Sequence, residues 1–194
     1  MAGKDDAAFI ADDFSLPVEN PFQSWMRPGG FDFTPDGKAA IVAMWNGDVW
    51  RMDGLMAKAP ATLTWRRVAS GLFQPLGLKI VDDKVYVLGR DQITRYVDSN
   101  QDGSADYYEN FNNEIMSTEG FHEFVFDLQT DKAGNFYFAK ANPVNSGGGG
   151  FGNNKAAAGN GVVCSHAGGL FKVSKDGKKF EVLARGFRAP NGIG

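Results

Sequence analysis

A short pattern that occurs three times constrains the fold of this chain more than any other feature. In each copy a proline is followed, two residues later, by a glycine and then by an apolar residue, at 28–31 (PGGF), 75–78 (PLGL) and 190–193 (PNGI). The last two copies also share the preceding stretch, because 68–74 and 183–189 carry apolar residues and a glycine at matching positions. A unit of short strands that repeats at this scale is typical of a β-propeller.

Between the copies, runs of alternating apolar and polar residues predict short strands joined by tight turns. The first unit contains runs of this kind at 31–33, 40–43, 48–52 and 65–69. Four strands in about 45 residues is the size of one propeller blade. The later units predict strands at 78–80, 85–88 and 92–96, and then at 124–126, 136–138, 169–173 and 180–183.

This spacing predicts an all-β chain. Residues 1–24 are polar and contain Pro17 and Pro21, so we expect an N-terminal arm there. Residues 25–194 are expected to form part of a β-propeller, with about three blades present and the last copy of the pattern opening a further blade. Propellers have about four to eight blades, and we expect the complete molecule to be six-bladed.

The bulk composition excludes some classes of partner. The net charge is −3 over 194 residues, which argues against a nucleic-acid-binding surface, because such surfaces need basic patches. No apolar run reaches the roughly 18 residues of a membrane span, and the first residues lack the basic start and apolar core of a signal peptide. The single cysteine, Cys164, cannot form an internal disulfide and leaves the redox compartment open.

An acidic segment after the run at 92–96 has the spacing of a calcium-binding loop. Within 98–109, oxygen-bearing side chains stand at positions 1, 3, 5, 9 and 12 and glycine at position 6, as the twelve-residue calcium loop requires. The predicted Ca²⁺ ligands are Asp98, Asn100, Asp102, Ser104 through its carbonyl, Asp106 directly or through water, and Glu109. The alternative is a solvated acidic turn. Because a strand precedes the loop, we expect no flanking helices and a structural role between blades.

Polar residues just before the first strand of each unit are the candidate site. Propellers bind ligands at the mouth of the central channel, so residues at equivalent repeat positions should converge on one face. They are Arg27, Gln74, His122 with Glu123, and Arg188 with Asn191. His122 is either a general base or a hydrogen-bonded loop residue. Arg27 and Arg188 either clamp an anionic ligand or form salt bridges between blades.

Two of these loops resemble a known family. His122 ahead of the strand at 124–126, and the run 186–193 (GFRAPNGI), resemble the soluble quinoprotein sugar dehydrogenases of the glucose/sorbosone dehydrogenase group. The runs 20–31 and 72–78 look closer still to large secreted bacterial propellers described as membrane-bound dehydrogenases, which often carry a c-type haem domain. The resemblance covers roughly residues 20–194.

The resemblance implies oxidation of a sugar or alcohol by pyrroloquinoline quinone (PQQ). His122 would be the base that takes the hydroxyl proton, and Arg188 would contact the quinone, with Arg27, Gln74 and Asn191 at the channel mouth. It also implies a periplasmic or secreted protein, a small-molecule substrate and a c-type cytochrome domain as a possible partner.

Two other functions stay open. The run Pro190-Asn191-Gly192-Ile193 is also similar to a motif of calcium-dependent lactonases of the gluconolactonase group, in which the asparagine would ligate a metal on the propeller axis that activates water or polarises a carbonyl. A propeller that only binds a partner, without chemistry, is the third possibility, because a fold does not fix a function.

Overall fold

The structure is a computed structural model that describes residues 8–9, 13–56, 62–118, 122–142 and 165–194. In these residues every regular element is a strand, and the strands form three separate four-stranded antiparallel sheets. The first sheet contains β1 (Pro28–Phe33), β2 (Ala39–Met44), β3 (Val49–Asp53) and β4 (Thr64–Ala69). The second contains β5 (Gly77–Val81), β6 (Lys84–Leu88), β7 (Ile93–Val97) and β8 (Tyr107–Asn112). The third contains β9 (Val125–Thr130), β10 (Phe136–Lys140), β11 (Gly169–Val173) and β12 (Phe180–Arg185).

Each sheet is a meander in which consecutive strands pair. The tight turns follow from local chemistry. Asp82 and Asp83, which join β5 to β6, both have positive φ angles (50° and 59°), and aspartate is one of the few residues that tolerates this conformation in a two-residue hairpin. In the β1–β2 turn the Thr34 hydroxyl donates to the Asp36 carboxylate at 2.7 Å. These are the turns that the sequence predicts.

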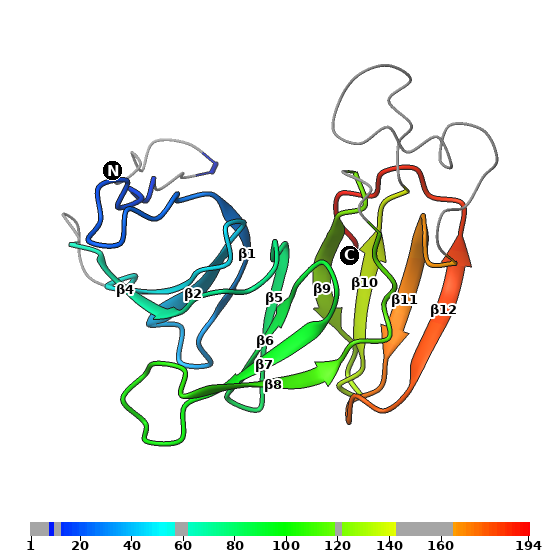
Figure 1. Cartoon of the computed structure of the whole chain (residues 1–194). Coiled ribbons are helices and arrows are strands. Elements are labelled where there is room, and N and C mark those ends of the chain that lie inside the picture. The colour runs from blue at the N-terminus through cyan, green and yellow to red at the C-terminus, as the bar shows by residue number, and fades with distance from the viewer. Residues whose placement is uncertain (1–7, 10–12, 57–61, 119–121, 143–164) are drawn as a thin grey trace, which may run out of the picture.

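The three sheets stand side by side, with their first strands adjacent to one another (Figure 1). Glycine permits this close approach, because a Cβ at Gly30 would lie 2.7 Å from Gly77 Cα and a Cβ at Gly77 would lie 2.9 Å from the Leu128 amide nitrogen. A side chain at either position would therefore push the first strands apart.

Two first strands accept a hydrogen bond on an aspartate side chain from the backbone of a neighbouring segment. The Ile80 amide of β5 donates to Asp32 Oδ2 of β1 at 3.0 Å. The Ile193 amide donates to Asp127 Oδ2 of β9, also at 3.0 Å. The last copy of the sequence pattern thus contacts β9 through Ile193, which stands at the repeat position of Leu78 rather than of Ile80.

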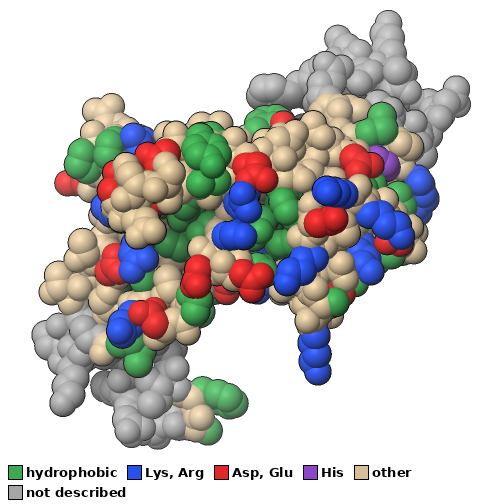
Figure 2. All heavy atoms as spheres, turned by 90° about the horizontal axis from the view of Figure 1, so that it is seen from below, with side chains coloured by type: hydrophobic (Ala, Val, Ile, Leu, Met, Phe, Trp, Pro, Cys, Tyr) green, Lys and Arg blue, Asp and Glu red, His purple; other side chains and the backbone are tan. Residues whose placement is uncertain are grey.

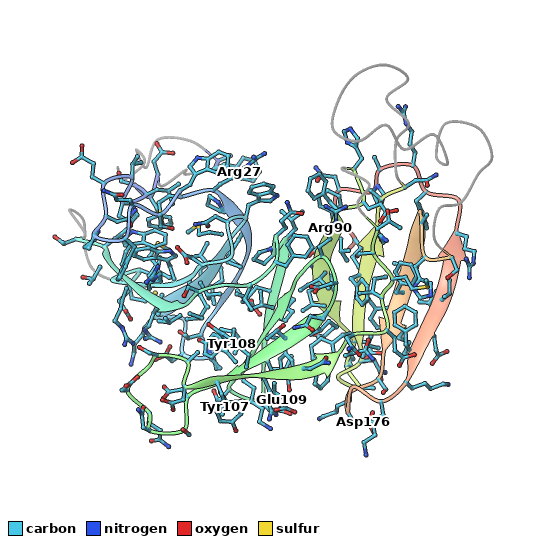
Figure 3. All side chains as sticks on the ribbon, in the orientation of Figure 1. Arg27, Arg90, Tyr107, Tyr108, Glu109 and Asp176 are labelled. Carbon is cyan, nitrogen blue, oxygen red and sulfur yellow. The ribbon has the colours of Figure 1, made fainter. Side chains whose placement is uncertain are left out.

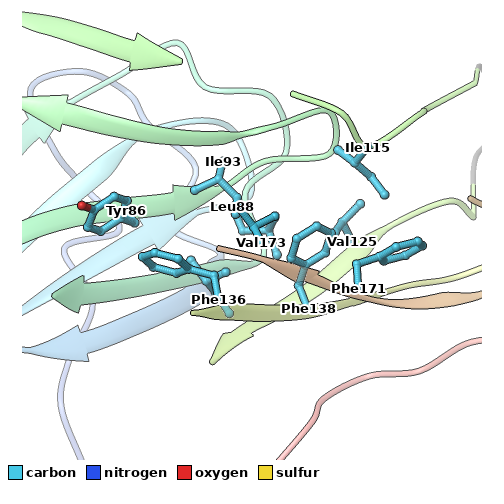
Figure 4. Packing of buried hydrophobic residues seen from close by; sticks show 10 residues of the cluster. Tyr86, Leu88, Ile93, Ile115, Val125, Phe136, Phe138, Phe171 and Val173 are labelled. Carbon is cyan, nitrogen blue, oxygen red and sulfur yellow. The ribbon is translucent and has the colours of Figure 1, made fainter. Parts of the chain in front are cut away.

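Two of the three apolar clusters lie between sheets, and the third covers the other face of the first sheet. The largest cluster lies between the second and third sheets (Figure 4) and includes Leu88, Phe138 and Phe171, each at most 1% exposed. Aromatic rings cross the sheet boundary there, because the Tyr86 ring centroid is 4.8 Å from that of Phe136. Such ring pairs add to the burial of apolar area, so this interface is apolar and close-packed.

The sequence predicted the all-β class and eleven of the strands to within a few residues, whereas β8 was not predicted. Its sequence, Tyr-Tyr-Glu-Asn-Phe-Asn, does not alternate regularly between polar and apolar residues, and its first three residues were assigned to the calcium loop. Residues 1–7 and 10–12 of the expected N-terminal arm lie outside the described residues. No helix long and apolar enough to cross a membrane is found in the part that is described.

Candidate functional site

The residues predicted at the channel mouth lie in the connections at one end of the sheets, where β1, β5 and β9 begin. This is the upper end in Figure 1, and Figure 3 shows Arg27 and Arg90 at the same end. Arg27 precedes β1, Gln74 precedes β5, and His122 with Glu123 precedes β9. The repeat therefore brings these positions to one end of the molecule.

A chain of hydrogen bonds joins Gln74 to Glu123, the neighbour of His122. Arg90, in the β6–β7 connection, donates from Nη1 to Gln74 Oε1 at 3.2 Å and from Nη2 to the Thr118 carbonyl at 3.1 Å. The Thr118 amide donates to Glu123 Oε2 at 2.8 Å. Lys140, the last residue of β10, donates from Nζ to the same Glu123 oxygen at 3.1 Å. Loops of the second and third sheets are thus joined by charge-assisted hydrogen bonds.

These groups are buried, which makes the network unusual. Glu123 and Lys140 are both 0% exposed and Arg90 is 6% exposed. Burial lowers the pKa of Arg90, against a smaller opposing effect of the Glu123 charge, yet an arginine stays protonated in proteins. Buried charges are costly unless they are paired and hydrogen-bonded, so this network fixes the loops that carry Gln74 and His122.

Arg90 and Lys140 are residues that sequence reasoning missed. Each is a cation at the end of an apolar run, Val-Tyr-Val-Leu-Gly-Arg and Phe-Tyr-Phe-Ala-Lys. The available signal was a cation at the end of the second strand of two units, β6 and β10. The phenyl rings of Phe73 and Phe124 flank Arg90, with centroids 5.8 and 5.9 Å from its Cζ.

His122, Arg188 and Asn191 have different surroundings. The side chains of His122 and Arg188 are exposed, and the Arg188 carbonyl accepts a hydrogen bond from the Asn142 amide at 2.9 Å. Asn191 lines a cavity of about 620 Å³ along the first strands, together with Asp127 and Gly77. Arg27 makes no contact with the Gln74–Glu123 network among the hydrogen bonds of the described residues. Its guanidinium lies over the rings of Trp25 and Trp45 instead.

The predicted calcium loop joins β7 to β8 at the opposite, lower end. Both Asp98 carboxylate oxygens accept backbone N–H bonds, Oδ1 from Asp102 at 3.2 Å and Oδ2 from Gly103 at 2.7 Å. The side-chain nitrogen Nδ2 of Asn100 donates to Asp102 Oδ2 and to Asp106 Oδ1, at 3.2 Å in each case. Hydrogen bonds from the Ser99 hydroxyl and amide lower the pKa of Asp106. Hydrogen bonds within the loop therefore involve four of its predicted ligands, and the Asn100 side chain contacts two of the others, Asp102 and Asp106.

Glu109 differs from this prediction. It belongs to β8, where it pairs with Arg95 of β7, and the two residues face each other across the strand pair. Because Glu109 lies in a strand, the direction of its side chain is set by the β7–β8 register and not by the loop. Within the described residues, no group of three or more His, Cys, Asp or Glu side chains is gathered closely enough to hold a metal.

The loop also contacts the first sheet. Arg66 of β4 donates to the carbonyls of Asp102 at 2.9 Å and Gly103 at 3.1 Å. The Ala105 amide donates to the Val68 carbonyl at 2.8 Å. The Tyr108 hydroxyl donates to the Ser70 carbonyl at 2.7 Å. The loop thus connects the first and second sheets. Arg66 does not bind the Ser104 carbonyl, which is the carbonyl predicted to bind Ca²⁺.

A larger hollow of about 750 Å³ lies beside this loop, between the first two sheets. Two of the cations that line it are paired, since Arg51 contacts Asp53 at 2.8 Å and Arg95 pairs with Glu109. Burial is the main reason why the pKa of Tyr96, which lines it, is raised to about 12. Viewed from below, acidic and basic side chains are interspersed over this end (Figure 2). The lower end therefore has the charge pattern of a solvated surface.

No family model matches the sequence, and no curated protein matches it. Among solved structures the chain is similar to a carbohydrate-active enzyme of family AA12 from Trichoderma reesei. For the iodide structure of that enzyme the identity is 13% and the TM-score 0.55, with 77% of this chain and 36% of that chain covered. For the calcium structure the identity is 13% and the TM-score 0.56, with 79% and 36% covered.

A third similar structure is an engineered GH43 glycoside hydrolase with endo-xylanase and exo-arabinofuranosidase activity, at 14% identity and a TM-score of 0.45, with 83% of this chain and 29% of that chain covered. The chain thus spans about a third of the length of the enzymes that it resembles. At these identities the likeness to the AA12 enzyme concerns the fold alone.

Proposed function

We propose that this chain is part of a β-propeller oxidoreductase that oxidises a CH–OH group of a sugar or alcohol with PQQ. The observation that carries the proposal is the gathering of Gln74, the His122–Glu123 pair and two buried cations at the end where the first strands begin. The fold likeness to a carbohydrate-active enzyme supports it.

The propeller itself is part of the proposal. It is supported by the three meandering sheets with adjacent first strands and by the hydrogen bonds that the Ile80 and Ile193 amides donate to Asp32 and Asp127 of first strands. The free edges of β1, β5 and β9 would then face the channel.

The donors at this end fit an anionic quinone. Arg188 presents an exposed cation, and the Gln74 side chain is oriented by Arg90. When bound, the quinone would accept the hydride from the substrate carbon. The exposed His122 imidazole would take the hydroxyl proton through a ring nitrogen, so that the CH–OH group becomes a carbonyl. Glu123, held by Thr118 and Lys140, would fix the backbone that carries His122. By resemblance, a c-type haem domain would accept the electrons, and the protein would be periplasmic or secreted.

Dye-linked oxidation of a panel of sugars and alcohols tests the proposal, with and without PQQ and Ca²⁺. We expect PQQ-dependent turnover that falls at least 100-fold in His122→Ala. The matched control is Lys132→Ala, in the exposed β9–β10 turn at the other end, which should keep full activity. The absence of both turnover and PQQ binding by absorbance would overturn the proposal. Lactone hydrolysis that needs only a divalent metal and is lost in Asn191→Ala would support the lactonase instead.

We also propose that the 98–109 loop binds Ca²⁺ and holds the first two sheets together. Its donors are oxygens, as Ca²⁺ prefers, and its backbone is already anchored by Arg66. Asp98, Asn100, Asp102 and Asp106 would supply side chains and Ser104 a carbonyl, while Glu109 stays with Arg95 unless the β7–β8 pair rearranges.

Thermal unfolding tests the calcium proposal without any activity assay. A ligand at 100 times its dissociation constant stabilises the folded state by about 2.7 kcal/mol, so Ca²⁺ should raise the Tm by several degrees relative to EDTA. Asp102→Ala should abolish that shift. Asp36→Ala, an exposed aspartate in the β1–β2 turn, should leave it intact. An equal Tm with Ca²⁺ and with EDTA would refute the site.

A further inference from the structure

Two tryptophans and an arginine form an exposed cluster at the upper end of the first sheet. The Arg27 Cζ lies 5.2 Å from the Trp25 ring centroid and 5.4 Å from that of Trp45. The two indoles meet edge to face, with centroids 5.9 Å apart. Trp25 is nevertheless 59% exposed. Exposing so much of a tryptophan forgoes the free energy that its burial would provide.

The exposure is built into the local backbone. Ser24 and Met26, on either side of Trp25, are each only 8% exposed, so alternate residues of this segment are anchored in the protein and Trp25 and Arg27 point outward. Asn20 fixes the preceding turn, because its side chain accepts from the Ser24 amide at 3.0 Å and donates to the Ser24 carbonyl at 2.9 Å.

The backbone that carries the second indole is also fixed by hydrogen bonds. The Trp45 amide donates to the Arg27 carbonyl at 2.8 Å, which ties the β2–β3 connection to the segment before β1. The adjacent Asn46 donates to the Ser24 hydroxyl at 3.0 Å and is itself exposed. The cluster is therefore preorganised, and a ligand would lose little affinity to the ordering of these side chains.

The charge in the cluster indicates what it would bind. Within the described residues, Arg27 forms no ion pair with a carboxylate. A guanidinium matches a carboxylate with two parallel hydrogen bonds. An exposed indole face has a negative quadrupole that attracts the weakly positive C–H groups of a flat ring.

We propose that Trp25, Arg27 and Trp45 form a binding site for a carboxylate-bearing saccharide. A pyranose ring would stack on the exposed face of Trp25, and its carboxylate would pair with Arg27. Asn46 would be a neutral hydrogen-bonding partner for ring hydroxyls. The site requires neither a quinone nor a metal, so it stands or falls independently of the dehydrogenase proposal.

Isothermal titration in calcium-free buffer tests this site. The probes are trigalacturonate and trimannuronate, each compared with its methyl ester, which keeps the rings and removes the charge. We expect the acid of at least one pair to bind at least 10-fold more tightly than its ester. Trp25→Ala should weaken binding of that acid at least 10-fold, and Trp25→Phe should retain part of it. Arg27→Gln should lower the affinity for the acid to that for the ester.

Tyr107→Ala is the matched control, because Tyr107 is 54% exposed and lies at the opposite end of the molecule (Figure 3). It should bind both forms as the unmodified chain does, and the circular dichroism spectra of all variants should superimpose. No binding of either acid at millimolar concentration would overturn the proposal. Equal binding of acid and ester, or unchanged binding by folded Trp25→Ala, would also overturn it.

Discussion

At the scale of single residues, the buried Glu123–Lys140 pair shows how the chain uses charge in its interior. Removing two ions from water costs several kcal/mol for each ion, and their attraction repays this only when further hydrogen bonds satisfy them. Here Glu123 also accepts from the Thr118 amide, and Lys140 also donates to the Met116 carbonyl. Both of these further partners belong to the loop between β8 and β9. The ion pair therefore holds that loop in place, in addition to neutralising the two charges.

Replacing Lys140 with methionine should therefore be strongly destabilising. The variant leaves the Glu123 carboxylate buried without its ammonium partner, and such losses cost about 3–5 kcal/mol. Urea unfolding measures the change. Lys132→Met, in an exposed turn, should change stability by less than about 0.5 kcal/mol. In the Glu123→Gln/Lys140→Met double variant the loss should be smaller than the sum of the two single losses. Additive losses would show that the two charges do not depend on each other.

His166 should make the stability depend on pH. Its Nδ1 accepts a hydrogen bond from the Met116 amide at 3.0 Å, and its ring packs at a tilt against Phe180, with centroids 5.0 Å apart. Burial, with smaller contributions from Lys140 and Arg185, lowers its pKa from the ordinary 6.5. Below pH 6.5 the unfolded chain therefore binds a proton that the folded chain does not, so stability falls as the pH drops through that value.

Urea midpoints between pH 7.5 and 5.5 measure this effect. His166→Asn keeps an acceptor near the Nδ1 position but cannot titrate in this range, so part of the pH dependence should disappear. Identical slopes in the two proteins would rule out His166 as its source.

At the scale of elements, the turns and the apolar alternation were readable from the sequence, because each depends on a few adjacent residues. Asp82 and Asp83 predict their hairpin by themselves. The direction of Glu109 was not readable, because it depends on the pairing of β8 with β7 across the calcium loop. The residue spacing within 98–109 matches the calcium-ligand pattern. Its last position, Glu109, nevertheless belongs to strand β8, because β8 pairs with β7. Arg90 was missed for a similar reason, since its partners Gln74 and Thr118 lie far from it in sequence.

The close approach of first strands predicts a sharp difference between two glycines of the same repeat position. In Gly30→Ala the new Cβ would lie 2.7 Å from the backbone of Gly77, which should cost about 1–3 kcal/mol through displaced strands. In Gly192→Ala the nearest atom, Asp127 Oδ2, would be 3.8 Å away, so stability should hardly change. Chemical denaturation distinguishes the two, and equal losses would contradict the packing argument.

At the scale of the whole molecule, the sheets are units joined by apolar clusters and by a small number of polar contacts. Arg66 and Asp32 both connect the first sheet to the second, from β4 to the calcium loop and from β1 to the Ile80 amide. Repetition along the sequence predicted the three units. It did not predict these contacts, because they occur between copies of the repeat rather than within one. The stability of each interface between sheets therefore depends on side chains that contact the neighbouring sheet, which the repeat pattern within one sheet does not predict.

The distribution of aromatic residues makes this arrangement measurable. The tryptophans are Trp25, Trp45, Trp50 and Trp65, all in or beside the first sheet, whereas every tyrosine lies in the second or third sheet. Tryptophan fluorescence therefore reports the first sheet, and far-ultraviolet circular dichroism reports all three. In a cooperative molecule the two urea transitions coincide.

The Asp32→Ala/Arg66→Ala double variant should separate those transitions. It removes the acceptor of the Ile80 amide and the donor to the Asp102 and Gly103 carbonyls, at about 1 kcal/mol for each hydrogen bond. The first sheet should then unfold at a lower urea concentration than the remainder, with the fluorescence transition preceding the circular dichroism transition. Asp36→Ala/Lys38→Ala, which removes an exposed pair within the β1–β2 turn, should leave the transitions coincident. If they coincide in both variants, the apolar interfaces alone are enough to make the three sheets fold as one.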